Sequence, residues 1–473
     1  MSLANSSDEC YRSDVAMPHS GGAARYQDTD TTNSTKTLSS EWEKQMRIRS
    51  RRSAVLAVSA VLLSALTLTG CSAGGSSPAA TKAASGPVTM WVRAATASQS
   101  QPLVDAYNAT HKNKVELTVV PTDNYLQKVG VAAGARQLPC LMASDAVYMP
   151  NFISKNLYMD ISSRVNSLGF KNKLAQGLMK LATKDGKVYG VPHSVSVSAI
   201  FQNDVLLKQA GIDPSEKLSS LQDLAKNAAK VAALGPDYSG LYFTGNNAGS
   251  ISFTHFPAIW ASGGEALSKD GSKSLLNSAA SVKVFSLFDQ MYKSGAIPKT
   301  VPSESGATRN DVFATGKVGY MMASNSVLQA VTENDSLKVG VQPIPGINGG
   351  QSAYVGGDDI GITTGCKNTD TAWDFLKWSL SEKGQVDVYA KMNQLTVRSD
   401  LASNQYSKAD ARMVELNKLV SLGDTPYAMN YGQTFNDPNG PALSVLRGAL
   451  FGDDTANALK SGNPSINASL ATQ

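Results

Sequence analysis

The sequence VTMWV at residues 88–92 opens the stretch that decides the fold class. This run is apolar and rich in strand formers, and a second run of the same kind spans residues 114–120. A third apolar run, CLMA, begins at Cys140. Helical patterns at residues 101–111 and 125–135 separate the three runs. Because strands and helices alternate, we expect an α/β fold in which crossover helices connect the strands of an open sheet.

The same alternation continues toward the carboxyl end of the chain. Amphipathic helices are predicted at residues 218–234 and 279–293, and strands at 240–244 and 318–323. In an open α/β sheet, ligands bind at the carboxyl ends of strands, where loops and helix amino termini present free N–H groups. This rule selects polar residues that follow predicted strands: Arg93, Asp145, Tyr148 and Asn325.

An export signal is predicted near the amino end of the chain. The arginine-rich sequence RIRSRR, residues 47–52, precedes an apolar run at 54–68 that is shorter than the roughly 20 residues of a membrane span. That run ends in LTGC, residues 68–71, which resembles the bacterial lipobox. The resemblance implies cleavage before Cys71 and a lipid on this residue, which would anchor the protein at the outer face of the bacterial cytoplasmic membrane. An uncleaved anchor, or a chance Cys after an ordinary signal, is the alternative.

The predicted signal divides the amino-terminal region into three parts. Residues 1–45 are interpreted as an extension before the true start at Met46, and a long cytoplasmic segment is the alternative. Residues 46–70 form the signal peptide. Residues 71–87 carry the lipid and form a Ser-, Ala- and Gly-rich tether. As a random coil such a tether reaches roughly 20 to 25 Å, enough to let a folded body swivel above the membrane.

Length and charge limit the classes of function. The chain after the tether is too long for one ordinary hydrophobic core, so we expect two lobes of roughly 150 to 200 residues each. The formal net charge of +5 is small for 473 residues, and no basic cluster alternates with aromatic residues. The composition therefore gives no support to nucleic-acid binding.

Catalysis finds little support among the residue types. The chain has four His and lacks the G-x-S-x-G, H-E-x-x-H and paired-Cys patterns. We therefore expect a protein that is not an enzyme and uses no metal or cofactor. A secreted glycosidase with two carboxylates is the catalytic alternative, and a lipid-anchored scaffold is the structural one.

Four sequence patterns occur in a fixed order along the folded body: DGKVYGVP at 185–192, FQN and AGID within 201–213, FATGKVGYM at 313–321, and AWDFLKW at 372–378. They resemble segments of the extracellular solute-binding proteins of carbohydrate ABC importers, similar to the maltodextrin-binding group. Each pattern alone is weak, whereas their shared order covers nearly all of the chain after residue 88. The chain is therefore identified as a member of extracellular solute-binding protein family 1.

The resemblance implies the two-lobed type II periplasmic-binding-protein fold, in which each lobe is an open sheet flanked by helices and a cleft lies between the lobes. Each lobe is discontinuous in sequence, with residues 88–198 and 353–400 in lobe 1 and residues 199–352 and 401–473 in lobe 2. The resemblance also implies a monomer that closes on a carbohydrate and delivers it to the permease of an ABC importer. A small solute other than a sugar is the alternative ligand.

Sugar binding requires aromatic rings for the C–H faces of the sugar and charged or amide groups for its hydroxyls. The resemblance places Asp145 as a hydroxyl acceptor after the third strand, and N-capping of the following helix is its structural alternative. His193 and Ser194 follow the YGVP turn at the hinge, where family members contact ligand. A lone residue such as His193 is more often a structural group.

The resemblance implies further ligand-binding residues in three other segments. Gly356, Gly357 and Asp358 lie where the chain returns to lobe 1, in a Gly-Gly turn that allows close approach of ligand to backbone. The alternative is that glycine there satisfies a positive φ. Arg398 lies in a segment similar to a P-x-R turn of the family, although the proline is missing here, and is expected either to reach a ligand hydroxyl or to brace the lobes. One aromatic cluster supplies stacking candidates, of which only one or two are expected to face the cleft: Phe253, His255, Phe256 and Trp260.

The export signal places Cys140 and Cys366 in an environment where disulfides persist. In the family fold, the strand that returns to lobe 1 runs antiparallel beside the third strand. Cys140 begins the third strand and Cys366 follows the returning strand, so the resemblance implies a disulfide between them.

Overall fold

The computed structural model describes residues 86–472. These residues belong to one structural unit of the chain, which begins at Ala80. The predicted amino-terminal extension, the signal peptide and Cys71 lie outside the described residues. Among the helices of residues 86–472, none is long and apolar enough to cross a membrane.

The first sheet has the strand order β2 (Val115–Val120), β1 (Val88–Arg93), β3 (Leu141–Asp145), β12 (Val355–Ile362) and β6 (Val191–Asn203). Strand β1 runs parallel to both β2 and β3, whereas β12 runs antiparallel to β3 and to β6. The three parallel strands coincide with the three apolar runs in the sequence, and helices connect them. This part of the predicted α/β topology is confirmed.

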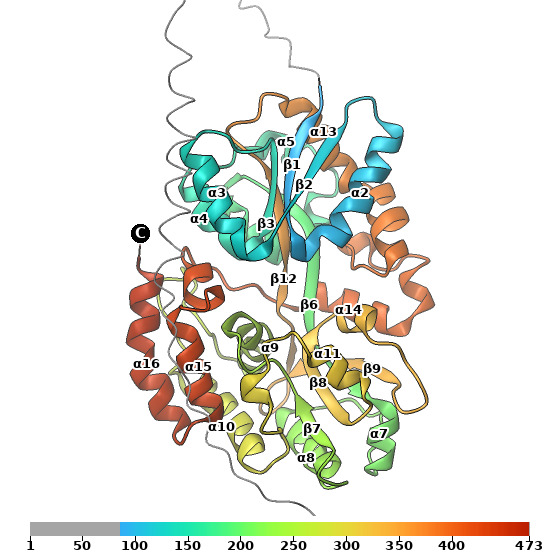
Figure 1. Ribbon diagram of the computed structural model, residues 1–473, viewed down its shortest axis with the longest axis vertical. Coiled ribbons are helices and arrows are strands. Elements are labelled where there is room, and N and C mark those ends of the chain that lie inside the picture. Colours follow the sequence, from blue (N-terminus) through green and yellow to red (C-terminus); the bar gives the residue numbers. More distant parts are fainter. Residues whose placement is uncertain (1–85, 473) are drawn as a thin grey trace, which may run out of the picture. The chain divides into compact units, whose positions relative to one another are not determined.

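Strand β6 belongs to two sheets. Its residues 191–197 pair with β12, and its residues from Ser198 onward pair with β8 (Val318–Ser324) and β9 (Val339–Gln342). Strand β7 (Ser239–Tyr242) runs parallel to β8 and completes the second sheet. Figure 1 shows β6 and β12 running between two groups of elements, which we call lobe 1, around the first sheet, and lobe 2, around the second. The two-lobed α/β fold is confirmed, and the residue limits given above for each lobe stay a prediction.

Helices surround both sheets. Lobe 1 contains α2 (Ala97–Thr110), α3 (Tyr125–Gly134), α4 (Met149–Ser154), α5 (Ser162–Asn166), α6 (Gln176–Leu181), α13 (Thr369–Ser379) and a hairpin of β4 (Thr183–Lys184) and β5 (Lys187–Val188). Lobe 2 contains α7 (Asp204–Gln209), α8 (Leu221–Ala232), α9 (Ala248–Ala261), α10 (Ala279–Lys293), α11 (Arg309–Ala314), α12 (Val327–Ala330), α14 (Ala411–Leu422), α15 (Pro441–Phe451), α16 (Thr455–Leu470) and a hairpin of β10 (Ile344–Pro345) and β11 (Gln351–Ser352).

Helix α8 illustrates why these segments become helices. Its N-cap residue Ser220 accepts a hydrogen bond from the Asp223 N–H at 3.1 Å, which satisfies one of the free donors of the first turn. The acidic Asp223 and the basic Lys230 lie at the ends that the helix dipole favours. Leu221, Leu224, Ala228 and Val231 recur at helical spacing and are buried, so one apolar face holds the helix on the sheet.

The lobes are joined where three chain segments run side by side. The start of β12 lies next to β6 on one side and next to residues 423–425 on the other. The Val355 N–H donates to the Asp424 carbonyl at 2.9 Å, and the Asp424 N–H donates to the Ala353 carbonyl at 3.0 Å. These bonds tie the third segment to the strand pair, so the connection between lobes is a narrow, hydrogen-bonded ribbon. Such a ribbon is suited to hinge motion.

Gly357 lies inside strand β12 at this connection, and not in the Gly-Gly turn that the sequence suggested. Its φ is +133°, and a Cβ added there would lie 2.1 Å from the Ser194 carbonyl oxygen. The positive φ, which was the alternative reason for a glycine here, lets β12 and β6 lie in close contact, and a role of Gly357 toward a ligand stays a prediction.

The predicted Cys140–Cys366 disulfide is present. Leu141 at the start of β3 pairs with Ile362 at the end of β12, and the Thr363 N–H donates to the Cys140 carbonyl at 3.0 Å. The antiparallel register thus brings the two cysteines together at one edge of lobe 1. The bond closes a loop between positions 226 residues apart.

The double variant Cys140→Ser, Cys366→Ser is expected to unfold at lower guanidinium concentration than the wild type. Closing so long a loop restricts the unfolded chain, and the chain-entropy model gives an upper figure of roughly 5 kcal/mol. Denaturation curves in the presence and absence of a reductant measure the effect. The reductant should destabilise the wild type and leave the double variant unchanged. A denaturation midpoint of the wild type that does not change with the reductant would contradict the prediction.

Asp359 is a buried carboxyl group in the middle of the first sheet. The residue is 0% exposed, and neither carboxylate oxygen has a hydrogen-bond partner among the described residues. Burial raises the pKa of Asp359 well above its usual 3.8, and the negative charges of Asp358 and Asp145 raise it further. The folded protein therefore holds a proton there that the unfolded chain releases at lower pH.

Asp359→Asn is expected to stabilise the protein increasingly as the pH rises. The contribution of Asp359 to the free energy of unfolding is fully present below its pKa in the unfolded chain, about 4. It is lost as the pH rises through its raised pKa in the folded protein. The loss is about 1.4 kcal/mol for each pH unit between these two pKa values. In calorimetric melting from pH 4 to pH 8, the melting temperature of the variant relative to that of the wild type should increase with pH. Asp237→Asn, whose side chain is 73% exposed, is the control and should show no such trend. A melting-temperature difference that is independent of pH would refute the assignment.

Candidate functional site

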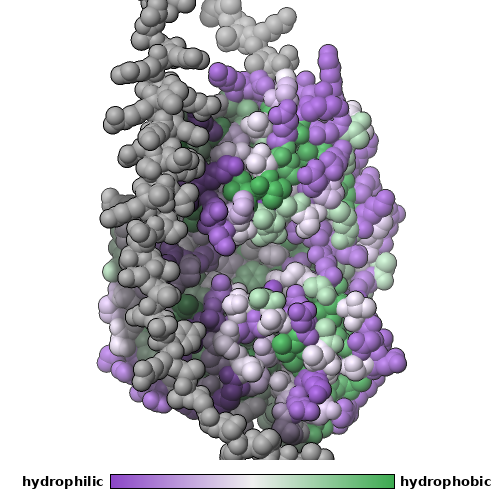
Figure 2. Space-filling model, in the orientation of Figure 1, coloured by the Kyte–Doolittle hydropathy of each residue, from purple (hydrophilic) through white to green (hydrophobic). Residues whose placement is uncertain are grey.

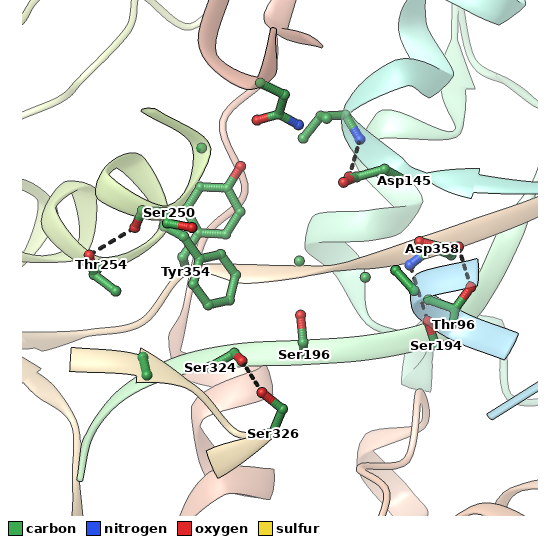
Figure 3. Close-up of a pocket in the computed structure, with 18 of the residues that line it drawn as sticks. Thr96, Asp145, Ser194, Ser196, Ser250, Thr254, Ser324, Ser326, Tyr354 and Asp358 are labelled. Carbon is green, nitrogen blue, oxygen red and sulfur yellow. Dashed lines mark hydrogen bonds between the residues drawn. The ribbon is translucent and has the colours of Figure 1, made fainter. Parts of the chain in front are cut away.

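A cavity of about 500 Å³ lies between the lobes. Four strands end at this cavity with their carboxyl ends: β1 and β3 in lobe 1, and β7 and β8 in lobe 2. This is the position that the rule for open α/β sheets gives for a ligand. Figure 2 shows the visible face hollowed near its middle. In the close-up of Figure 3, side chains of lobe 1 and lobe 2 stand on opposite sides of the open space.

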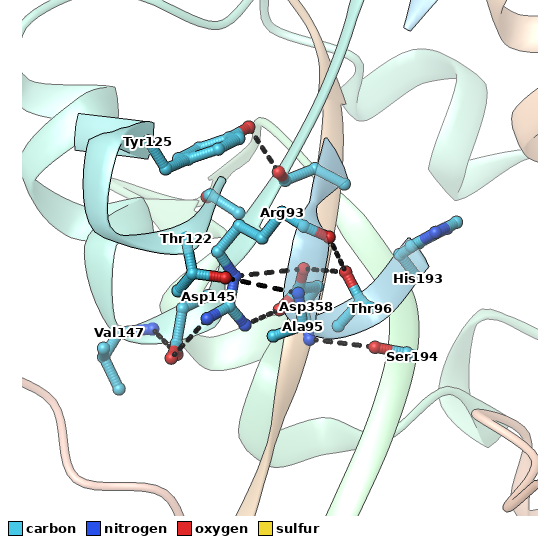
Figure 4. A network of polar contacts seen from close by, with 12 residues as sticks. Arg93, Ala95, Thr96, Thr122, Tyr125, Asp145, Val147, His193, Ser194 and Asp358 are labelled. Carbon is cyan, nitrogen blue, oxygen red and sulfur yellow. Dashed lines mark hydrogen bonds and ion pairs between the residues drawn. The ribbon is translucent and has the colours of Figure 1, made fainter. Parts of the chain in front are cut away.

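The lobe 1 wall is built around Arg93, at the end of β1. Its guanidinium donates to Asp358 through both Nη2 and Nε, the latter at 3.4 Å, and its Nη1 lies 3.5 Å from the Asp145 carboxylate. Thr96 Oγ1 donates to Asp358 at 3.0 Å. The Asp358 N–H donates to Ser194 Oγ at 3.3 Å, which links β12 to β6. Figure 4 shows this network across β1, β3, β6 and β12.

The two aspartates of the network have different surroundings. Asp358 is 0% exposed and accepts from both Arg93 and Thr96, so it is a structural counter-charge. The Asp145 side chain is 25% exposed and lines the cavity. Its Oδ1 accepts from the Val147 N–H at 3.3 Å, so it also caps the short helix that follows. Asp145 is therefore the carboxylate that a ligand hydroxyl can reach.

The charges of this network control its protonation. Burial alone would lower the pKa of Arg93, but the charges of Asp358 and Asp145 outweigh it and raise that pKa, so the guanidinium stays charged. Burial raises the pKa of Asp145, and the nearby Arg93 partly reverses the effect. The arginine thus favours the ionised form of a carboxylate that burial would otherwise neutralise.

The aromatic surface of the cavity consists of Phe253, on α9, and Tyr354, just before β12. Their ring centroids are 4.9 Å apart and both residues line the cavity. Trp260 lies behind them, with its ring 5.8 Å from that of Tyr354. The pair offers an apolar face of the kind that stacks on the C–H groups of a sugar ring.

The remaining walls carry hydroxyl and amide groups. In lobe 2, Asn247 caps α9 by accepting from the Ser250 N–H at 2.8 Å. Ser324, the last residue of β8, and Ser326 form a hydroxyl pair at 2.6 Å, near Ser196 of β6 in Figure 3. Polar groups that line the cavity without having been predicted include Thr96, Gln99, Thr244, Asn247, Ser250, Arg309 and Asn436.

The structure brings about half of the predicted ligand-binding residues to the cavity. The residues that line it are Arg93, Asp145, Ser194, Phe253, Gly356, Gly357 and Asp358. The residues that do not are Tyr148, His193, His255, Phe256, Trp260, Asn325 and Arg398. Of the aromatic cluster on α9, only Phe253 lines the cavity, as expected for one or two of its members.

The two histidines are structural groups. His193 is buried beside the site, with Nε2 2.8 Å from Ser100 Oγ, and burial lowers its pKa to about 4. His255 is packed in lobe 2 with its ring 4.7 Å from that of Phe243 and 4.4 Å from that of Phe288. Burial lowers its pKa to about 3. Both imidazoles are therefore neutral near pH 7 and turned to the interior.

Packing also explains the other residues outside the cavity. Phe256 is fully buried against Phe435 and does not line the cavity. Asn325 accepts from the Val197 N–H at 3.0 Å and so braces β6. Tyr148 packs its ring on the backbone of Gly432.

Arg398 lies away from the cavity, in lobe 1. It forms an ion pair with Asp400 at 2.5 Å, donates to the Leu380 carbonyl at 3.1 Å and stacks over Phe170 at 3.9 Å. These three contacts occupy the guanidinium, so it holds loops of lobe 1 together and is not available to a ligand.

A two-lobed α/β body with a polar and aromatic cavity at its hinge defines the class of solute-binding proteins. The family model of the bacterial extracellular solute-binding proteins matches residues 102–414, and the chain belongs to this family. The family acts outside the cytoplasm, which agrees with the predicted export of this chain.

One protein of similar sequence and two solved structures of similar fold illustrate the resemblance. The diacetylchitobiose binding protein DasA of Streptomyces coelicolor is 26% identical over 380 residues, which cover 78% of this chain and 86% of DasA. The structure of the sugar-binding protein MalE from Xanthomonas citri has a TM-score of 0.72 and 18% identity, with 81% of this chain and 97% of MalE covered. The GacH receptor of Streptomyces glaucescens has a TM-score of 0.69 and 22% identity, with 82% of this chain and 99% of the receptor covered.

Asp358→Asn is expected to destabilise the protein far more than Asp145→Asn. Removing the charge of Asp358 leaves Arg93 without its closest partner, and breaking a buried pair costs about 3–5 kcal/mol. The Asp145 carboxylate is farther from Arg93 and partly exposed, so its removal should cost about 1 kcal/mol or less. Urea denaturation of both variants measures the difference. Equal losses of unfolding free energy in the two variants would show that Asp358 is not the main structural counter-charge of Arg93.

Proposed function

We propose that this protein is the receptor of an ABC importer, which binds a carbohydrate between its lobes and delivers it to the permease. The observation that carries the proposal is the composition of the cavity. The rings of Phe253 and Tyr354 share one space with the Asp145 carboxylate and a set of hydroxyl and amide groups. Aromatic faces and polar acceptors together are what a sugar requires.

The relatives favour the same ligand class. DasA is named for the disaccharide diacetylchitobiose, and MalE of Xanthomonas citri is named as a sugar-binding protein. In the proposed mechanism, lobe 2 rotates about the ribbon of β6, β12 and residues 423–425, and the lobes enclose the ligand. Phe253 and Asp145 would then contact the ligand from opposite sides, so closure would be coupled to binding.

The anchoring of the receptor also belongs to the proposal. We infer that Cys71 carries a lipid at the outer face of the cytoplasmic membrane and that residues 71–87 tether a monomeric binding protein there. The sequence LTGC at 68–71 supports this inference. A tethered receptor stays close to a permease in the same membrane while its lobes open and close freely.

Catalysis is not part of the proposed role. A glycosidase needs one carboxyl group that donates a proton and a second that acts as base or nucleophile. In this cavity Asp358 is bound to Arg93 and Thr96 and is fully buried, which leaves Asp145 as the carboxylate with access to a ligand. The relatives described above are named for binding and not for chemistry.

Addition of a cognate sugar is expected to raise the melting temperature of the protein. A ligand at 100 times its dissociation constant adds about 2.7 kcal/mol to the free energy of unfolding. A thermal-shift screen of mono- and oligosaccharides, polyols and sugar phosphates would identify the ligand class. Mass spectrometry should recover the ligand unchanged. A response to peptides or amino acids alone would reject the carbohydrate class.

Phe253→Ala and Asp145→Asn are expected to weaken binding of that sugar about fivefold or more. The first removes a stacking face and the second a charged hydroxyl acceptor, each worth about 1–3 kcal/mol. Isothermal titration calorimetry measures the affinities. Phe256→Leu, which changes a buried ring on the same helix, is the matched control and should retain the wild-type affinity. Unchanged affinity in both cavity variants would place the site elsewhere.

A further inference from the structure

Two arginines line the cavity, and their surroundings differ. Arg93 in lobe 1 is paired with two carboxylates. Arg309, the first residue of α11 in lobe 2, has no ion pair within 4.0 Å among the described residues. The lobe 2 wall therefore carries a cation that forms no ion pair among the described residues, although an arginine in such a place normally forms one.

The hydrogen bonds of Arg309 are also incomplete. Its Nε is buried without a partner in the described part of the chain, and its Nη1 reaches Thr244 Oγ1 only at 3.5 Å. Burial lowers the pKa of Arg309, and the charge of Glu304 only partly offsets this effect. The donors of the guanidinium fork are thus largely unused while the group is partly removed from water. A buried donor without a partner is costly unless a ligand satisfies it.

Glu304 is not available as the missing partner, because its carboxylate is bound elsewhere. Its Oε1 accepts from the Gly306 N–H at 2.6 Å, and its Oε2 accepts from Thr308 Oγ1 at 2.6 Å and from the Tyr242 hydroxyl at 3.2 Å. These bonds use Glu304 to shape the loop before α11. Glu304 therefore forms no ion pair with Arg309 at the cavity wall.

The neighbouring wall is favourable to an anion as well. Helix α9 begins at Ala248, and its first-turn residues Gly249 and Ser250 line the cavity together with Arg309. The amino end of a helix of this length carries a partial positive charge, although the Ser250 N–H is already bound to Asn247. The Thr244 hydroxyl, next to Arg309, can supply a further donor. The opposite wall carries the negative Asp145.

We propose that the carbohydrate bound in this cavity carries one acidic group, which pairs with Arg309 at the lobe 2 wall. The inference rests on the proposed function and specifies its substrate class as an acidic sugar with a carboxylate or a phosphate. Phe253 and Tyr354 stack on the ring of the sugar. Asp145 accepts a hydrogen bond from a hydroxyl at the neutral end of the sugar. Since Asp145 repels a second anion, the ligand lies in one orientation, with its acidic end toward α11.

Matched neutral and acidic sugars test the proposal. Titration calorimetry of the full chain should compare galactose with galacturonate, and glucose with glucuronate and glucose 6-phosphate. At least one acidic sugar should bind tenfold or more tightly than its neutral parent, and the preference should shrink as salt is raised. Tighter binding of a uronate would identify the acidic group as a carboxylate, and tighter binding of glucose 6-phosphate would identify it as a phosphate.

Variants of Arg309 make the assignment specific. Arg309→Gln should lose tenfold or more in affinity for the acidic sugar while changing the affinity for its neutral parent little, and Arg309→Lys should keep part of the preference. Arg164→Gln, at an arginine that pairs with Asp370 in lobe 1, is the control and should bind as the wild type does. Melting curves of the unliganded variants verify that each is folded.

The possible outcomes separate the two proposals. If a neutral sugar binds more tightly than every acidic counterpart, or if Arg309→Gln weakens both members of a pair equally, the acidic-ligand inference is overturned and the carbohydrate receptor stands. If no carbohydrate binds at all, the proposed function falls and the inference falls with it. A preference for the acidic sugar that Arg309→Gln abolishes establishes both.

Discussion

The pairing of β6 with β12 is the constraint on which the rest of the structure depends. Both strands run at the junction of the two sheets, and β6 exchanges its partner from β12 to β8 between Val197 and Ser198. Gly357 lets the backbones approach so closely that any side chain would meet the Ser194 carbonyl. This one contact joins the lobes, forms the hinge, and brings Ser194, Gly356 and Asp358 to the wall of the cavity.

The electrostatics of the cavity follow from that arrangement. Because β12 returns between β3 and β6, the carboxylate of Asp358 is brought to the end of β1, where it neutralises Arg93. Asp145 is then a second, weaker partner that can exchange its contacts for those of a ligand. The cation of the opposite wall, Arg309, has no such partner among the described residues. The two walls thus offer a ligand opposite charges.

Sequence patterns identified the elements better than the contacts of individual side chains. The runs at 88–92 and 114–120 became β1 and β2 because alternating apolar residues of high strand propensity are a local property. The rule on strand ends correctly selected Arg93 and Asp145 for the cavity wall. It failed for Asn325, whose amide turns to the backbone of Val197, since the direction of a side chain depends on its neighbours in space.

The sequence by itself determined the α/β topology, because strand and helix patterns are local, and its motif order indicated the family. The pairing of Cys140 with Cys366 followed from the fold that this resemblance implies. Only the tertiary structure decided which polar groups are free to bind. Arg93, Arg309 and Arg398 look alike in sequence, yet two are satisfied by aspartates and one is not. The carboxylates that neutralise Arg93 come from distant segments, and Arg309 has no ion pair in the described part of the chain, so no local pattern records whether a charge is neutralised.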